Sequence, residues 1–150
     1  MTVDASGNID VLLIDDNEDD VHLALRALRR IAPDTTVETV NDGVEALELI
    51  RDFQLHGTQL PRVLLVDVAM PRLNGIELVR RLREDDELRG LPIVMFTTSD
   101  AARDVDASYE AGCNAYVVKP FSVGDLTDVL QSLITFWRFN VVPRRLGSRA

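Results

Sequence analysis

Polar side chains that could do chemistry follow four apolar runs of this sequence, each at the point where the run ends. Asp15 and Asp16 follow residues 9–14, Asp67 follows residues 63–66, Thr97 follows residues 92–96, and Lys119 follows residues 115–118. A carboxylate at the end of a buried strand is costly unless it is exposed, paired or bound to a metal. Asp67 alone could merely cap the turn after it, because Asp favours turns. The same pattern at four strand ends instead indicates a binding site.

The residue types indicate chemistry on a phosphoryl group. Three carboxylates held together repel one another, and a divalent cation relieves the repulsion. Mg²⁺ is typically bound by one or two carboxylates, waters and a phosphate oxygen, which suits Asp15, Asp16 and Asp67; Mn²⁺ is the alternative ion. Lys119 and the Thr97 hydroxyl would supply a positive charge and a hydrogen-bond donor for the other phosphoryl oxygens. Asp67 is the central acid and therefore the expected nucleophile, since Asp carboxylates form acyl phosphates.

The elements that must position these residues alternate between strand and helix five times. Apolar or β-branched runs predict strands at residues 9–14, 35–40, 63–66, 92–96 and 115–118. Helical spacing of apolar residues marks the stretches 21–32, 44–50, 76–82, 101–111 and 126–133. This alternation predicts an α/β fold, a parallel sheet covered by helices on both faces. Ligands of such sheets bind beyond the carboxyl ends of the strands, where the polar residues fall.

Composition excludes several classes of protein. The 150 residues suit one domain, and hydrophobic and charged fractions of 46% and 27% are ordinary for a soluble globular protein. A net charge of −9 argues against nucleic-acid binding, which needs a basic patch. The sequence has no secretory signal at its start and no apolar run as long as a membrane span. The single cysteine, Cys113, suits a reducing compartment. We therefore expect a cytoplasmic protein that binds neither nucleic acid nor membrane.

Four separated motifs resemble the receiver domains of two-component response regulators. They are IDD at 14–16, DVAMPRLNG at 67–75, FTTS at 96–99 and YVVKPF at 116–121. The resemblance covers about residues 10–136, and the spacings of 30 residues from Asp67 to Thr97 and 22 from Thr97 to Lys119 also resemble those of the family. The resemblance implies a flavodoxin-like, doubly wound (βα)5 fold whose five-stranded parallel sheet has the order 2-1-3-4-5.

The resemblance also implies roles for the acidic residues. Asp67 would accept a phosphoryl group from a phosphohistidine of a sensor histidine kinase. Asp16 would bind Mg²⁺ directly and Asp15 through water, while the Asp67 carboxylate and the backbone carbonyl of Ala69 complete the protein ligands. Ala69 and Ser99 should border the path of the water that removes the phosphoryl group. The protein would thus catalyse its own phosphorylation and dephosphorylation, yet serve as a signalling switch and not as an enzyme in the usual sense.

The resemblance further implies a switch driven by phosphorylation. Thr97 and Lys119 would hold the phosphoryl oxygens, and the Lys119–Pro120 peptide bond is expected to be cis. Phosphorylation adds about −1.5 to −2 charges. Thr97 would move toward this charge and Tyr116, the switch aromatic, would turn inward. The surface that then binds a different partner consists of the predicted helix 101–111, strand 115–118 and last helix.

The expected domain organisation is a flexible N-terminus at 1–8, a receiver domain at 9–137 and a tail at 138–150 without an output domain. A stand-alone receiver must act through contact with another protein, itself included. The segments EDDVHLALRALRR and FWRFNVVPRR resemble single-domain regulators associated with phytochrome-type and other hybrid histidine kinases. Aromatic side chains beside arginines near the chain end suit an interface. We expect a homodimer through the surface of helix 101–111, strand 115–118 and the last helix.

Other interpretations fit the residues less well. A phosphatase with an aspartyl nucleophile would need a second acid two residues after Asp67, where Ala69 stands. A degenerate receiver that binds partners without phosphorylation would lack a site residue, and all are present. A nucleotide- or flavin-binding module would need a GxGxxG or Walker loop, which this sequence lacks. His22 and His56 are interpreted as surface residues, and Cys113 as a buried structural residue.

Overall fold

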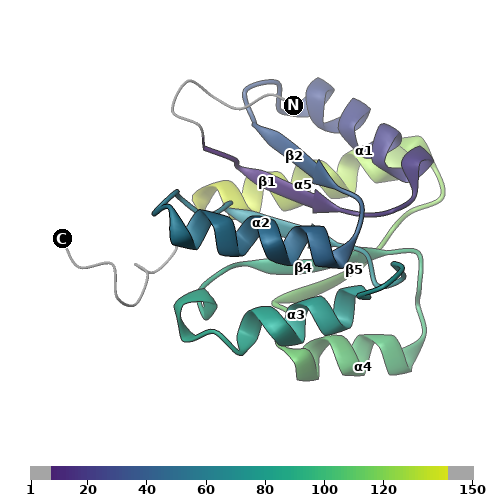
Figure 1. Ribbon diagram of the computed structural model, residues 1–150. Coiled ribbons are helices and arrows are strands. Elements are labelled where there is room, and N and C mark those ends of the chain that lie inside the picture. Colours follow the sequence, from purple (N-terminus) through teal and green to yellow (C-terminus); the bar gives the residue numbers. More distant parts are fainter. Residues whose placement is uncertain (1–7, 142–150) are drawn as a thin grey trace.

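The computed structural model describes residues 8–141, in which five strands and five α-helices alternate (Figure 1). The strands are β1 (Val11–Ile14), β2 (Val37–Val40), β3 (Val63–Val66), β4 (Ile93–Thr97) and β5 (Ala115–Val118). The helices are α1 (Glu18–Ile31), α2 (Gly43–Leu55), α3 (Gly75–Arg83), α4 (Ala102–Ala111) and α5 (Val123–Phe139). A short 3-10 helix, Asp86–Leu88, follows α3 and was not expected from the sequence.

The strands form one parallel sheet in the order β2-β1-β3-β4-β5, which confirms the predicted topology. The register explains how the site assembles. Ile14 pairs with Val66, so Asp15 and Asp67, the residues that follow, leave two neighbouring strands side by side. Thr97 pairs with Val118, the residue before Lys119. The polar residues of all four strands therefore meet at the carboxyl edge of the sheet.

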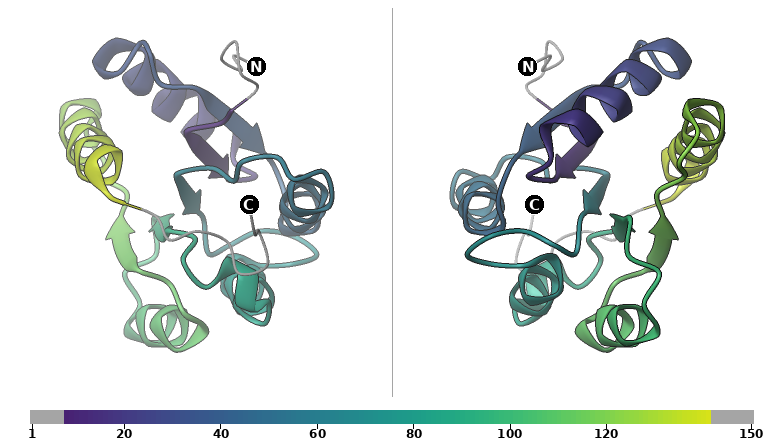
Figure 2. Two further views of the ribbon diagram at one scale, coloured as in Figure 1. Left: turned by 90° about the vertical axis from the view of Figure 1, so that its left-hand side faces the viewer. Right: turned by 90° about the vertical axis from the view of Figure 1, so that its right-hand side faces the viewer.

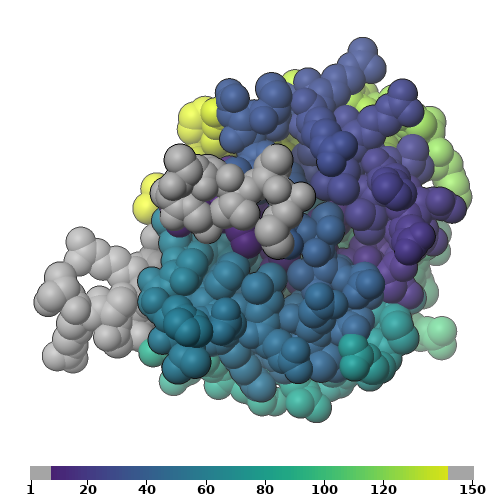
Figure 3. All heavy atoms as spheres, turned by 45° about the horizontal axis from the view of Figure 1, so that its top comes forward, coloured from purple at the N-terminus to yellow at the C-terminus, as the bar shows by residue number. Residues whose placement is uncertain are grey.

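Helices cover both faces of the sheet, as expected for buried parallel strands. Helices α1 and α5 pack on one face, and α2, α3 and α4 pack on the other (Figure 2). Seen from the side of α1, the atoms of α1 and α2 form neighbouring parts of the surface (Figure 3). Every residue of β1, β3 and β4 is buried, which explains why these strands are continuous apolar runs.

Most helices begin with a side-chain cap. The side chains that accept a hydrogen bond from the backbone N–H three residues later are those of Asn17, Asp42, Asn74 and Ser122. Helix α4 differs, because Ala101 precedes it and provides no side-chain cap. It also buries only Ser108 and Ala111. Helix α4 is therefore the helix without a side-chain cap and with the fewest buried residues among the five.

The structure extends the last helix beyond its expected end. Helix α5 continues to Phe139, so Arg138 and Phe139, the first residues of the expected tail, are helical. Residues 1–7 and 142–150 hold most of the expected flexible N-terminus and tail, and those expectations lie outside the described residues. Within residues 8–141, no helix combines the length and apolar character needed to cross a membrane.

Candidate functional site

Three carboxylates gather where β1 and β3 end. Asp15, Asp16 and Asp67 each offer one oxygen, and these oxygens all lie within 4.8 Å of one another. Asp15 and Asp67 are buried, whereas Asp16 is exposed. A cluster of carboxylate oxygens that is open to water on one side fits a hard divalent cation that keeps part of its hydration shell. The expected acidic cluster is therefore present with a donor set suited to Mg²⁺ or Mn²⁺.

The amine of Lys119 reaches the same cluster from the end of β5. Its Nζ lies 2.5 Å from Oδ2 of Asp15 and 3.4 Å from Oδ2 of Asp67. Only 7% of the Lys119 side chain is exposed, so its charge acts in a partly water-excluded space. The Nζ atom also lies 5.8 Å from the centre of the Phe96 ring. Lys119 can thus place a positive charge beside a group bound to Asp67.

Burial and the neighbouring charges have opposite effects on the pKa of Asp15 and on that of Lys119. Burial raises the pKa of Asp15 to about 6, although its hydrogen bonds to Lys119 and Asn17 work in the other direction. Burial lowers the pKa of Lys119, but the hydrogen bond to Asp15 and the charge of Asp67 outweigh it, so the pKa lies above its usual value. Lys119 therefore stays cationic at neutral pH.

Asp67 is fixed through its backbone, while its largely buried side chain makes only long hydrogen bonds. Its N–H donates to the carbonyl of Ile14 at 2.9 Å, which ties it to β1. Its Oδ1 lies 3.4 Å from the N–H of Ala69, an exposed residue, and makes only a long hydrogen bond there. A carboxylate oxygen that makes only long hydrogen bonds to the protein keeps lone pairs available to attack an electrophile at this edge of the sheet.

The residues expected to form the switch lie next to one another, but Thr97 does not contact Asp67 among the described hydrogen bonds. The Thr97 hydroxyl is buried and accepts from the N–H of Ser99 at 3.3 Å. The Tyr116 hydroxyl donates to the Ser99 carbonyl at 2.9 Å, and the side chain is half-buried. The Ser99 hydroxyl donates to Asp104 of α4 at 2.6 Å. Ser99 thus links β4, β5 and α4.

The structure corrects one expectation at this edge. The Lys119–Pro120 peptide bond is trans, not cis, because the described residues contain no cis peptide bond. The trans form is the intrinsically preferred one for X–Pro bonds, by about 0.5–1 kcal/mol. The cis form had been inferred from the resemblance alone, and no local residue pattern required it.

Sequence reasoning missed one residue of the site. Asp20, in the first turn of α1, places Oδ2 3.0 Å from Nζ of Lys119. In the sequence, Asp20 has a sufficient explanation in the helix dipole. The only signal was that the acidic run from Asp15 to Asp20 is longer than a helix start needs. The other expectations hold: His22 and His56 are exposed, and Cys113 is buried.

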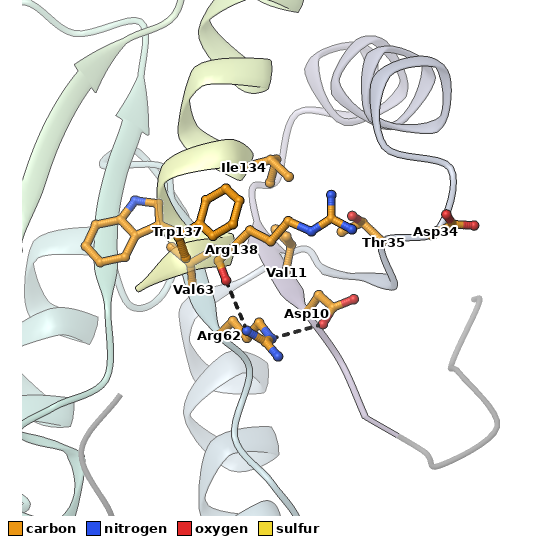
Figure 4. A pocket seen from close by; sticks show the side chains of 10 residues that line it. Asp10, Val11, Asp34, Thr35, Arg62, Val63, Ile134, Trp137 and Arg138 are labelled. Carbon is orange, nitrogen blue, oxygen red and sulfur yellow. Dashed lines mark hydrogen bonds and ion pairs between the residues drawn. The ribbon is translucent and has the colours of Figure 1, made fainter. Parts of the chain in front are cut away.

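A second hollow lies at the opposite end of the strands, where β1 and β3 begin (Figure 4). Its volume is about 400 Å³. The Arg62 side chain lines the hollow and connects Asp10 with the end of α5. Its Nε lies 3.5 Å from a carboxylate oxygen of Asp10, and an Nη donates to the Arg138 carbonyl at 3.4 Å. Trp137 lies beside these residues. The contacts of Arg62 connect the end of α5 to the sheet. The hollow is separate from the site around Asp67.

Comparison with known proteins points to one family. The model of the response regulator receiver domain matches residues 11–131. The probable methanogenesis regulatory protein FilR2 of Methanothrix harundinacea is 32% identical over 127 residues, which are 85% of this chain and 82% of FilR2. Response regulator Rcp1 of Synechocystis sp. is 28% identical over 128 residues, which are 85% of this chain and 87% of Rcp1.

Similar solved structures come from the same family. The crystal structure of the Mn²⁺-bound form of Rcp1 has a TM-score of 0.78 and 27% identity, and covers 90% of this chain and 99% of Rcp1. The phosphorylated cyanobacterial phytochrome response regulator RcpA has a TM-score of 0.81 and 27% identity, and covers 91% of this chain and 99% of RcpA. With the parallel sheet and the acidic cluster described above, these matches show that the chain belongs to the response regulator receiver domains of two-component signalling.

Proposed function

We propose that Asp67 accepts a phosphoryl group from a phosphohistidine of a sensor histidine kinase, and that the chain acts as a signalling switch. The observation that carries the proposal is the position of the Asp67 carboxylate, which lies within 4.8 Å of two other acids and 3.4 Å from a buried amine. A carboxylate oxygen would form the new bond to phosphorus while the bond from phosphorus to the histidine nitrogen breaks. Such transfers depend mainly on positioning and charge neutralisation, which this cluster provides.

The acids would hold Mg²⁺, with Mn²⁺ as a substitute. Asp16 and Asp67 would bind the ion directly, Asp15 would bind through water, and the Ala69 carbonyl would complete the protein ligands. The ion would supply positive charge to the phosphoryl oxygens. The cluster geometry and the Mn²⁺-bound form of Rcp1 support this assignment. Lys119 and Thr97 would hold the remaining phosphoryl oxygens through an ammonium and a hydroxyl.

The phosphoryl group would act on partners through α4, β5 and α5. Thr97 would turn its hydroxyl from the Ser99 N–H toward the phosphoryl group, which changes the support of the loop before α4. Tyr116 would turn further inward as Thr97 moves, and its bond to the Ser99 carbonyl ties it to the same loop. Because α4 has no side-chain cap, it is the helix that a small change in this loop would move most easily.

The donor would dock beside the site, over α1 and the loop after β5. A cavity of about 160 Å³ opens there, and its lining includes Asp15, Lys119 and Phe121. Phe121 is fully exposed, Leu23 of α1 lines the same cavity, and Val123 is also exposed. Exposed apolar side chains around a charged site suit a protein partner. The similarity to RcpA, a phytochrome response regulator, supports a phytochrome-type kinase as the donor.

We also propose a homodimer through the surface of α4, β5 and α5. Tyr109, Val118 and Phe136 are 50%, 42% and 64% exposed, one from each element. Aromatic and aliphatic side chains of this kind are enriched at interface cores.

The single cysteine, Cys113, is buried and unpaired, which supports action in the reducing cytoplasm.

Intact-mass analysis after incubation with acetyl phosphate tests the proposal. Wild type should gain one phosphoryl mass in the presence of Mg²⁺ and none after removal of divalent ions. Asp67→Asn should gain none. Asp100→Asn is a matched control, because Asp100 is an exposed acid that also follows a strand, and it should behave as wild type. If wild type gains no mass from acetyl phosphate or from a kinase donor, the proposal is wrong.

A further inference from the structure

Asp20 holds the amine of Lys119 from the side of α1. The distance from its Oδ2 to Nζ is 3.0 Å, and its side chain is 31% exposed, against 7% for Lys119. The backbone N–H of Asp20 donates to the side chain of Asn17, the N-cap of α1, at 3.0 Å. The carboxylate of Asp20 is therefore held by a capped helix turn, and the contact joins α1 to the end of β5.

Asp20 differs from the other acids around Lys119 because it lies outside the cluster that fits a cation. That cluster consists of Asp15, Asp16 and Asp67. Asp15 and Asp67 would turn oxygens toward a bound ion, whereas Asp20 would still accept from Lys119. An ammonium has three hydrogens to donate, and each of the three described hydrogen bonds of Nζ is to a carboxylate. A phosphoryl group on Asp67 would therefore have to compete with Asp20 for this amine.

We propose that Asp20 is a positioning residue that restrains Lys119 and so limits the rate at which Asp67 takes up a phosphoryl group. This inference rests on the proposed phosphoryl transfer at Asp67. Two effects of Asp20 act in the same direction. Its hydrogen bond keeps the Lys119 amine on the side of α1, and its negative charge opposes the approach of an anionic donor. Asp20→Asn keeps the size of the side chain and removes the charge.

The first test compares the rate of phosphorylation by acetyl phosphate in wild type, Asp20→Asn and Asp19→Asn, all with saturating Mg²⁺. Asp19 is an exposed acid in the same helix turn, so Asp19→Asn removes the same charge from α1 without touching Lys119. Asp20→Asn should react faster than Asp19→Asn by about two- to fivefold, the range expected for a partly exposed ion pair. An Asp20→Asn protein that is no faster than Asp19→Asn would overturn the inference.

The second test needs neither metal nor donor. Lys119 is the only lysine in the sequence, so lysine labelled with ¹³C and ¹⁵N gives NMR signals from a single side chain. Asp20→Asn should shift the signals of the Lys119 side chain, because the 3.0 Å hydrogen bond to Asp20 is lost, whereas Asp19→Asn should leave them unchanged. Identical Lys119 signals in Asp20→Asn and wild type would show that Asp20 does not hold the amine and would overturn the inference.

The two tests separate this inference from the proposed function. A wild type that never takes up a phosphoryl group contradicts both. A wild type that is phosphorylated at Asp67 with Mg²⁺, together with an Asp20→Asn variant that matches Asp19→Asn, contradicts only the role of Asp20. Far-UV circular dichroism of both variants checks that α1 is intact.

Discussion

Gly75 lies so close to Asp67 that a β-carbon on residue 75 would come within 2.0 Å of the Asp67 carbonyl oxygen and 2.8 Å of its carbonyl carbon. The N–H of Gly75 also donates to the carbonyl of Val68 at 2.9 Å. The first residue of α3 is therefore packed directly on the backbone that carries the candidate phosphoryl acceptor. Only a residue without a side chain allows this approach, so Gly75 fixes the position of Asp67.

Gly75→Ala should displace the Asp67 backbone or tilt α3. We expect it to lower the free energy of unfolding by about 1–3 kcal/mol, as overpacking does, and to slow phosphorylation. Gly124→Ala is the control: the added carbon meets open space in the first turn of α5 and should stabilise by about 0.4–1 kcal/mol. Urea unfolding followed by the fluorescence of Trp137, the only tryptophan, measures both. Equal stability of Gly75→Ala and wild type would contradict the packing argument.

Tyr116→Phe should loosen the loop before α4. It removes the hydroxyl that donates to the Ser99 carbonyl, a loss of about 0.5–1.5 kcal/mol for a typical hydrogen bond. Hydrogen exchange should become faster in the first turn of α4. Tyr109→Phe is the matched control, because Tyr109, the only other tyrosine, is half exposed. The link between Tyr116 and α4 would be refuted by equal exchange rates in the two variants.

Lys119→Met should strengthen Mg²⁺ binding and lower the stability of the metal-free protein. The amine now competes for oxygens of Asp15 and Asp67, and its removal leaves these buried carboxylates without a cation. The affinity for Mg²⁺ should rise about tenfold, since unit charges 4 Å apart interact by about 1 kcal/mol in water and by more near protein. Isothermal titration calorimetry measures this affinity. An affinity equal to or below that of wild type would contradict the competition.

Asp42 should make stability depend on acidity at low pH. Its hydrogen bond from the Glu45 N–H and its ion pair with Arg72 lower its pKa. A carboxyl with a lowered folded-state pKa stabilises above its unfolded pKa of about 3.9 and loses that contribution as the pH falls through the folded value. Wild type should thus exceed Asp42→Asn in stability at neutral pH, and the gap should close below about pH 4. Urea unfolding across this pH range tests it, and a constant gap would contradict it.

The fold could be predicted from the sequence because the central strands have clear sequence patterns. Residues 63–66 and 93–96 are continuous apolar runs, which suit strands buried on both faces, and a polar residue marks where each ends. The order of elements then requires parallel pairing, and parallel pairing brings Asp15, Asp67 and Lys119 to one edge. These parts depend on local patterns and on general rules of topology.

Contacts between distant side chains could not be predicted in the same way. Asp20 and Lys119 are 99 residues apart, and Asp20 has a sufficient local explanation at the start of α1. The hydroxyl of Ser99, a residue expected to border the path of the attacking water, bonds to Asp104, and this contact depends on how α4 packs. The Lys119–Pro120 bond was expected to be cis from the resemblance, but it is trans. The sequence could not decide between the isomers, because the two forms of an X–Pro bond lie close in energy.

The most direct test of the account is to locate the phosphoryl group. Wild type would be incubated with acetyl phosphate and Mg²⁺, trapped with borohydride, which reduces an aspartyl phosphate to homoserine, and digested for peptide mass mapping. The account predicts homoserine at residue 67 and unmodified aspartate at Asp15, Asp16 and Asp20. Homoserine at one of those three positions, with Asp67 unmodified, would contradict the assignment of Asp67 as the acceptor.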